Sequence, residues 1–400
     1  MKFNTQLVHG GESVMKSTLP PIVQSSAFTF ESAEDQEKVF AHKKMGYAYT
    51  RIGNPTITAF ESQINAIEGG RGALACSSGM AALSLAFLNI CQPGDEIIAG
   101  WNLYGGTIEL FKDLAHYGIT THFISLNDAA VLESTINAHT KVIFGEMLSN
   151  PSLEILDVEK VSSIAHDHGL PLFVDNTAAT PYLIQPLKHG ADVVIHSSSK
   201  YINGTSNAIS GVIIDGGRFH WDIAQYPSLQ AYGKYRKMAY YMRLRDDLSQ
   251  NIGACLSPQN AYLNVLGLET LGLRMQRICE NALALAKHLE SLGVKVNYPA
   301  LHDPLTALLN GHHGGGLLTC DVGDKEKAFQ VINRLKLAHI VSNIGDVKTL
   351  VVHPASTIAV HNTIKEQERA GIYPGTIRVS VGIEDIEDLK ADFDQAIKGE

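Results

Sequence analysis

Two neighbouring apolar runs decide the fold class: Leu172-Phe173-Val174-Asp175-Asn176-Thr177 and, further along the chain, Val193-Val194-Ile195-His196-Ser197-Ser198-Ser199-Lys200. Each run is short and ends in polar residues, which is typical of a buried strand in a parallel sheet. Ligands bind beyond the carboxyl ends of such strands. We therefore expect Asp175, Ser197, Ser199 and Lys200 to converge on one crevice.

These side-chain types match the needs of pyridoxal 5'-phosphate (PLP). A lysine forms a Schiff base with this cofactor, an acid pairs with its pyridinium nitrogen, and hydroxyl groups hold its phosphate. Taken alone, a Ser-Ser-Ser-Lys run is typical of a solvated loop, and an aspartate after a strand is often a helix N-cap. The order of the two motifs and their shared position at strand ends favour the cofactor.

The composition is typical of a large protein that buries much of its surface. The chain has 400 residues, which favours two or more domains, and it is 45% hydrophobic but only 18% charged. The net charge of -9 argues against binding to nucleic acid or to an anionic membrane. The first residues lack the apolar core of a signal peptide, and polar residues interrupt the weakly apolar stretch from Gly72 to Ile90.

Cysteine and histidine usage favours a cytoplasmic protein without a metal centre. The five cysteines form no CxxC pair, and their odd number suits a reducing compartment. The 17 histidines include no HExxH motif.

Three segments are expected along the chain. Residues 1–55 contain Gly10-Gly11 and Pro20-Pro21 and little periodicity, which predicts an arm that contacts a neighbouring subunit. Residues 56–250 alternate strand and helix patterns, which predicts a PLP-binding α/β domain with a mainly parallel, doubly wound sheet. Residues 251–400 predict a linking helix over about 260–292 and a smaller α+β domain. The expected strands are 73–76, 96–99, 120–124, 141–147, 171–175, 192–196, 209–214, 317–322, 349–352 and 377–381.

Other candidate site residues also lie at the ends of expected elements. Ser78, Gly79 and Met80 open a helix whose free N–H groups make an anion site, although a serine N-cap followed by a glycine turn gives the same pattern. Tyr104 follows a strand and can stack on a planar ring, or lie half-buried beside a turn. Asn150 precedes a proline and can donate to the cofactor's phenolate oxygen, or serve only the turn.

Two arginines are candidates for binding anions. Tyr49 and Arg51 are two residues apart on an extended segment, so their side chains point the same way and can clamp a phosphate in a neighbouring subunit. An interface strand with a surface arginine is the alternative. Arg378 lies among β-branched residues in a buried strand and needs an anionic partner, either a substrate α-carboxylate or a structural carboxylate.

In this order, the motifs resemble the cysteine/methionine-metabolism family of PLP enzymes over nearly the whole chain. The resemblance implies the type I PLP-dependent fold and a homotetramer of tight dimers with active sites at the dimer interface. It implies that Lys200, Tyr104 and Asp175 are catalytic, with Lys200 the Schiff-base lysine and Asp175 the pyridinium partner. It also implies cofactor contacts from Ser78, Gly79, Met80, Asn150, Thr177, Ser197 and Ser199, phosphate ligands donated by the neighbouring subunit's Tyr49 and Arg51, and substrate contacts from Tyr49, Asn150, Ser342 and Arg378.

Three segments resemble the sulfhydrylase branch of that family: Val341–Lys348, Leu256–Ala261 and Gly267–Leu271. Gly106 stands where methionine γ-lyases carry a cysteine. Two segments depart from the family pattern: Ile358-Ala359 replaces Thr-His, and Gly204–Ala208 lacks the histidine of a Gly-His-Gly-Thr-Ser stretch.

The resemblance implies a γ-replacement on O-acetyl-L-homoserine, in which a sulfur nucleophile gives homocysteine. It implies two small-molecule partners, the amino-acid substrate and the sulfur donor. A methionine or homocysteine γ-lyase, a cystathionine γ-synthase-type enzyme, and a non-catalytic α/β protein that keeps only the scaffold remain alternatives.

Overall fold

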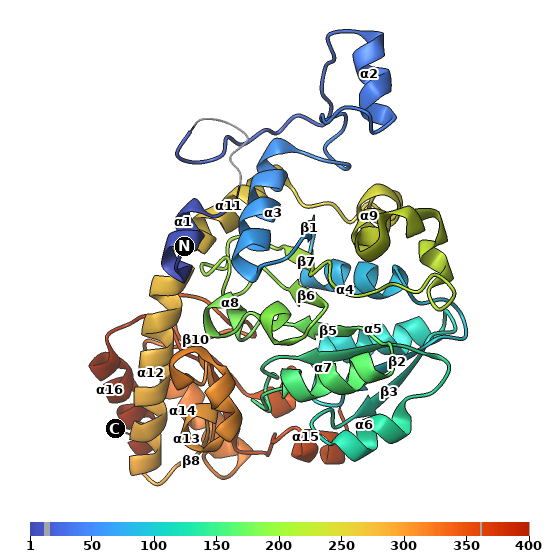
Figure 1. Cartoon of the computed structure of the whole chain (residues 1–400). Helices are drawn as coiled ribbons and strands as arrows, with labels where there is room; N and C mark the ends of the chain where they lie inside the picture. Colours follow the sequence, from blue (N-terminus) through green and yellow to red (C-terminus); the bar gives the residue numbers. More distant parts are fainter. Residues whose placement is uncertain (12–16, 361, 400) are drawn as a thin grey trace.

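The computed structural model describes residues 1–11, 17–360 and 362–399. Its larger sheet has seven strands in the order β1-β7-β6-β5-β4-β2-β3 (Figure 1). Strands β2 to β6 run parallel to one another, and β7 is antiparallel to both β1 and β6. The expected mainly parallel sheet is therefore confirmed. The strands are β1 (Gly72–Cys76), β2 (Glu96–Gly100), β3 (Thr120–Ile124), β4 (Thr140–Glu146), β5 (Leu172–Asp175), β6 (Val193–His196) and β7 (Gly211–Asp215).

The central strands are apolar on both faces because helices cover both sides of the sheet. Successive residues of β5 enter different cores: Leu172 and Val174 pack in one, and Phe173 packs in the other. The first core is covered by α3 (Pro55–Glu68), α7 (Val158–Asp167), α8 (Thr180–Leu183) and α11 (Pro258–Glu269). The second is covered by α4 (Gly79–Leu88), α5 (Gly105–Ala115) and α9 (Ala239–Arg243). The remaining helices of this region are α6 (Ala129–Thr135) and α10 (Ser249–Ile252).

A second sheet of five strands, in the order β10-β11-β12-β9-β8, forms the C-terminal α+β unit. All its neighbouring strands are antiparallel except β10 and β11. Its strands are β8 (Lys295–Asn297), β9 (Leu317–Asp321), β10 (His339–Ile340), β11 (Leu350–Val352) and β12 (Thr376–Ser380). Its helices are α13 (Pro299–His302), α14 (Lys325–Arg334), α15 (Ile364–Arg369) and α16 (Ile386–Lys398).

The single linking helix expected over about 260–292 is instead two helices, because the helix breaks at Thr270. The second, α12 (Leu271–Ser291), belongs to two cores. Met275 and Ile278 pack with the large-sheet core, whereas Leu285 and Leu289 pack with the C-terminal core. We therefore propose that the two domains divide within α12 rather than near residue 250.

The N-terminal segment is not uniform. Helix α1 (Phe3–His9) packs on α3, α11 and α12 of its own chain, and Leu7 is buried there. Helix α2 (Ala33–Phe40) buries no residue and stands away from the rest of the chain (Figure 1). The role of this segment as an arm on a neighbouring subunit therefore stays a prediction for the part around α2. In the described part of the chain, no helix combines the length and hydropathy that crossing a membrane requires.

Substitutions of Phe87 would test how α4 packs against the large sheet. The Phe87 side chain is 0% exposed and contacts the rings of Phe111, Phe144 and Phe173. Phe87→Ala leaves a cavity and should lower the free energy of unfolding by about 3–5 kcal/mol, measured by urea denaturation. Phe87→Leu should lose distinctly less, and equal losses in the two variants would contradict this packing.

Candidate active site

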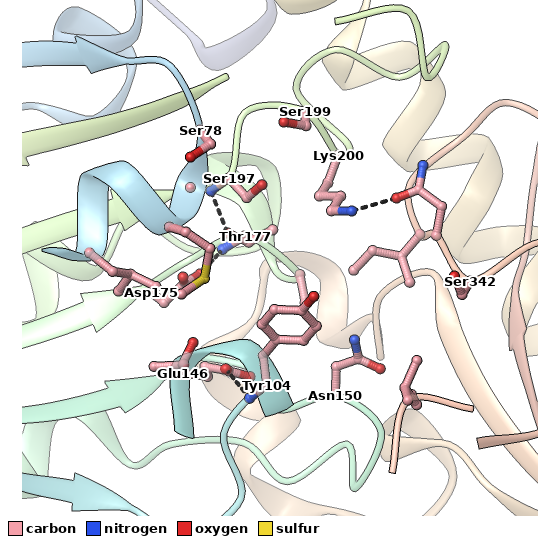
Figure 2. A pocket seen from close by; sticks show the side chains of 18 of the residues that line it. Ser78, Tyr104, Glu146, Asn150, Asp175, Thr177, Ser197, Ser199, Lys200 and Ser342 are labelled. Atoms are coloured by element: carbon pink, nitrogen blue, oxygen red, sulfur yellow. Dashed lines mark hydrogen bonds between the residues drawn. The ribbon is translucent and has the colours of Figure 1, made fainter. Parts of the chain in front are cut away.

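A cavity of about 350 Å³ lies at the carboxyl ends of β4, β5 and β6 and is closed by loops from the C-terminal unit (Figure 2). The structure brings twelve of the predicted site residues to this cavity, from both sheets and from the start of α4. They are Ser78, Gly79, Met80, Tyr104, Asn150, Asp175, Thr177, Ser197, Ser199, Lys200, Ser342 and Arg378.

Tyr49 and Arg51 do not line this cavity. The Arg51 guanidinium donates to the Gln250 carbonyl oxygen at 2.5 Å and lies 5.4 Å from the centre of the Tyr49 ring. The two residues therefore lie together, as their spacing predicts, but away from the other candidates of the same chain. Their action in a neighbouring subunit stays a prediction.

The floor of the cavity holds two partly buried carboxyl groups on adjacent strands. Glu146 of β4 is in register with Asp175 of β5. The Thr177 N–H donates to Asp175 at 2.8 Å, and the Tyr104 N–H donates to Glu146 at 2.6 Å. Burial raises the pKa of both carboxyls, and the charge of Asp175 raises the pKa of Glu146 further.

Neither carboxyl has an ion-pair partner among the described residues. The imidazole of His196, which lies behind Asp175, lowers the Asp175 pKa only as the smallest of several effects. A desolvated carboxylate requires a nearby cation to remain ionised. The pyridinium nitrogen of PLP would supply that cation.

The opposite end of the cavity is suited to a phosphate. Ser78 caps α4 by accepting the Ala81 N–H at 3.0 Å, so the helix presents its free N–H groups and positive dipole end to the cavity. A Cβ on Gly79 would lie 2.7 Å from the Ser197 Cβ, so only glycine allows the loop after β6 to approach this closely. The Thr177 hydroxyl accepts the Ser197 N–H at 2.8 Å and orders the same loop.

Ser199 reaches the cavity with a hydroxyl that already has partners. It donates to the Ser210 carbonyl oxygen at 2.9 Å and accepts the Ser210 N–H at 2.8 Å. Ser199 therefore ties the loop to the segment before β7. A direct bond from Ser199 to the phosphate would require its hydroxyl hydrogen to turn away from Ser210.

The Lys200 amine projects into the middle of the cavity and donates to the Asn343 side-chain oxygen (Figure 2). Burial, and then the charge of Arg378, lower the pKa of Lys200. A lowered pKa increases the fraction of neutral amine, which is the nucleophilic and basic form.

Arg378 of β12 is a buried guanidinium with an unused donor. It is 3% exposed, and its Nη atoms donate to the Asn150 side-chain oxygen at 3.2 Å and the Asn343 carbonyl oxygen at 2.9 Å. Its Nε has no hydrogen-bond partner, and burial lowers its pKa to about 10. A carboxylate is the anion that a guanidinium binds best, and Ser342 lines the cavity with it.

Three polar residues of this cavity, Thr107, Glu146 and Asn343, are not among the residues predicted from the sequence. Glu146 lies at the end of an expected strand, as Asp175 does, and that shared position is a signal in the sequence that could have identified it. Asn343 stands within a recognised segment, but only the structure brings its side chain to the Lys200 amine.

The fold and the cavity define a PLP-dependent enzyme of the type I fold. The residues present fit the cofactor, because the cavity combines an unpaired, partly buried acid, a helix N-terminus and a lysine with a lowered pKa. Residues 4–398 match the family described as Cys/Met metabolism PLP-dependent enzyme, and the chain belongs to that family.

Individual relatives match along their whole length. The chain is 37% identical to the O-acetyl-L-homoserine sulfhydrylase of Leptospira meyeri, covering 99% of this chain and 97% of the relative. It is 39% identical to the enzyme of the same name from Corynebacterium glutamicum, covering 98% and 96%.

Two solved structures share the fold over the whole chain. A Campylobacter jejuni protein assigned as an O-acetylhomoserine (thiol)-lyase, which carries a pyridoxyl-lysine phosphate, matches with a TM-score of 0.93 at 34% identity, over 100% of both chains. A cystathionine γ-lyase from Lactobacillus plantarum in complex with L-serine matches with a TM-score of 0.85 at 31% identity, over 100% of this chain and 99% of that one.

Glu146 gives a direct test of the acid pair. Burial and the charge of Asp175 raise the pKa of Glu146 and so favour its protonated form, which a glutamine resembles. Glu146→Gln should therefore keep kcat/KM within about threefold at pH 7.5, while Glu146→Ala loses about tenfold or more. The alanine variant loses the acceptor for the Tyr104 N–H. Steady-state kinetics of the PLP-loaded variants would check this, and equal losses in both would show that Glu146 acts as an anion.

Proposed function

We propose that this enzyme catalyses γ-replacement on O-acetyl-L-homoserine, in which a sulfur nucleophile displaces acetate and homocysteine forms for methionine biosynthesis. The observation that carries the proposal is that Lys200 and Arg378 line the same cavity. A basic amine and a buried guanidinium line one cavity, which is the arrangement that an α-amino acid substrate needs. The names and full-length coverage of the relatives support the same reaction.

Residue roles follow from the positions of the side chains. We propose that Arg378, Asn150 and Ser342 orient the substrate carboxylate. Lys200 would take the proton from Cα and then one from Cβ, and would return protons to both carbons after the sulfur has added, since its lowered pKa makes it a base. PLP supplies the electron sink that makes loss of the Cα proton possible.

Two further residues would hold the reacting groups in place. Tyr104 is 47% exposed, and its ring projects into the cavity, where it can stack on the cofactor and assist departure of the acetate (Figure 2). Asp175 would hold the proton on the ring nitrogen.

We further propose that the enzyme works as a homo-oligomer of tight dimers, a tetramer, in the cytoplasm. Tyr49 and Arg51 would then complete the phosphate site of a neighbouring subunit, which fits their absence from the cavity of their own chain. All five cysteines are unpaired, which suits a reducing compartment.

A γ-lyase is the second candidate, favoured by the likeness to the cystathionine γ-lyase structure. The same groups would act on Cα and Cβ, but no nucleophile would add at Cγ, and the eliminated product would instead be hydrolysed to 2-oxobutyrate and ammonia. The two reactions differ in how well the cavity keeps water from the substrate.

A product assay should separate the two functions. Given O-acetylhomoserine, the PLP-loaded enzyme should release homocysteine only when sulfide is present, with little 2-oxobutyrate. Lys200→Ala should lose at least about 10²-fold in turnover, because positioned acid–base groups contribute about 10²–10⁴. Abundant 2-oxobutyrate regardless of sulfide would make the enzyme a lyase, and a loss in turnover of less than about tenfold in Lys200→Ala would exclude the role given to Lys200.

Arg378→Gln should impair binding of the amino-acid substrate more than binding of PLP. Loss of a charge-assisted hydrogen bond costs about 1.5–3 kcal/mol, which predicts a rise in KM for O-acetylhomoserine of about 10- to 100-fold. The absorbance of bound PLP should persist. Unchanged KM in this variant would place the substrate carboxylate elsewhere, and Ser342→Ala serves as the comparison with a smaller expected effect.

A further inference from the structure

A second cavity of about 190 Å³ lies directly beside the first. Three residues line both cavities: Tyr104, Asn150 and Ile358. The second cavity extends from this shared wall toward α15 and the start of α5. Anything bound in it would therefore face the reacting end of the amino-acid substrate across the Tyr104 ring.

The walls of this second cavity combine apolar side chains with polar ones such as Asn102, Ser152 and Asn362. The apolar side chains include Trp101, Leu103, Ile108, Phe123 and Ile372. Ile358-Ala359, which departs from the family's Thr-His, also falls on this wall. Both side chains are apolar, and Ala359 is the smaller of the two. The volume of the cavity is well above the ~30 Å³ that one water molecule occupies in the liquid.

One cation that lines the second cavity, Arg369, forms no ion pair among the described residues, and its charge affects the pKa of Glu154 only as the smallest of several effects. The Arg369 guanidinium lies 4.4 Å from the centre of the Trp101 ring. A guanidinium stacked on an aromatic face keeps its edge donors free for a carboxylate.

The other charged residues of this lining already have partners. Lys112 pairs with Glu109 at 2.8 Å. The Glu366 carboxylate accepts the Thr363 N–H at 2.6 Å and the Thr363 hydroxyl at 2.8 Å. Arg369 is therefore the group of this cavity that is available to bind an anion.

We propose that this second cavity binds the sulfur nucleophile, and that it admits a small organic thiol carrying a carboxylate, with the carboxylate at Arg369 and the sulfur at the wall shared with the first cavity. The proposal rests on the proposed γ-replacement and specifies its second substrate. The apolar side chains of the walls would hold the carbon chain of the thiol, and sulfide, which has no chain, would use only the inner end of the cavity.

The reaction with such a thiol balances without any oxidant or reductant. The sulfur forms a bond to Cγ of O-acetylhomoserine, and the bond between Cγ and the ester oxygen breaks. Acetate leaves with that electron pair, and the thiol proton passes to solvent. The product is a thioether amino acid with a second carboxylate, which differs in mass from homocysteine.

The proposal is tested with three nucleophiles on the PLP-loaded enzyme: sulfide, 1-propanethiol and 3-mercaptopropionate. The two thiols have the same chain length and differ in the carboxylate. We expect both to give the thioether by mass spectrometry, with kcat/KM for 3-mercaptopropionate about tenfold or more above that for 1-propanethiol. In Arg369→Gln this ratio should fall by about tenfold. Lys365→Gln is the matched control, because Lys365 is an exposed cation of α15 outside the cavity lining, and it should leave the ratio unchanged.

A second variant tests the cavity rather than the charge. Ala359→His restores the ring of the family pattern, and it should lower the ratio of 1-propanethiol to sulfide reactivity by about tenfold. Homocysteine from sulfide without thioether from either thiol would overturn the proposal and leave the proposed function standing. Equal use of the two thiols in wild type and in Arg369→Gln would also overturn it. Absence of homocysteine with sulfide would instead reject the proposed function itself.

Discussion

The active site depends on one electrostatic constraint, the pair of partly buried carboxyls at the ends of β4 and β5. The strand register places Glu146 beside Asp175, and burial raises the pKa of both. Thr177 is ordered by Asp175, and the start of α5, with Tyr104, is held by Glu146. The described chain supplies no ion-pair partner for either acid. A cation that binds there would therefore stabilise the ionised form of the acid it contacts. The pyridinium of PLP is such a cation.

The second sheet turns this cofactor site into an amino-acid site. Arg378 reaches from β12 to Asn150, in the turn after β4, and to the loop at Asn343, and the Asn343 side chain contacts the Lys200 amine. The same Ser206 hydroxyl that accepts from the Asn343 side chain donates to Asp346 at 2.5 Å, so the altered loop after Lys200 still supports the site. The packing of the two units along α12 therefore sets the position of the substrate carboxylate relative to the base.

Much of this was predictable because parallel strands bring their carboxyl ends to one edge. Asp175 and Ser197 could be placed from apolar runs alone, and Arg378 from its β-branched neighbours. The contact of Asn343 with Lys200 was not predictable, since it joins residues 143 positions apart across two sheets. The break at Thr270 was also missed, because apolar spacing continues through it. The second cavity depends on how α15 lies against Trp101, and periodicity carries no information about such contacts.

The most direct test is the protonation state of the cofactor ring nitrogen in the PLP-loaded enzyme. ¹⁵N NMR with labelled PLP at pH 8 reports this state from the chemical shift of the ring nitrogen. In the wild type we predict a protonated nitrogen, because Asp175 and the ring form one stabilising ion pair. In Asp175→Ala the nitrogen should lose its proton, because that ion pair is missing. An unprotonated nitrogen in the wild type would contradict the account, since the carboxyl pair would then remain without its cation.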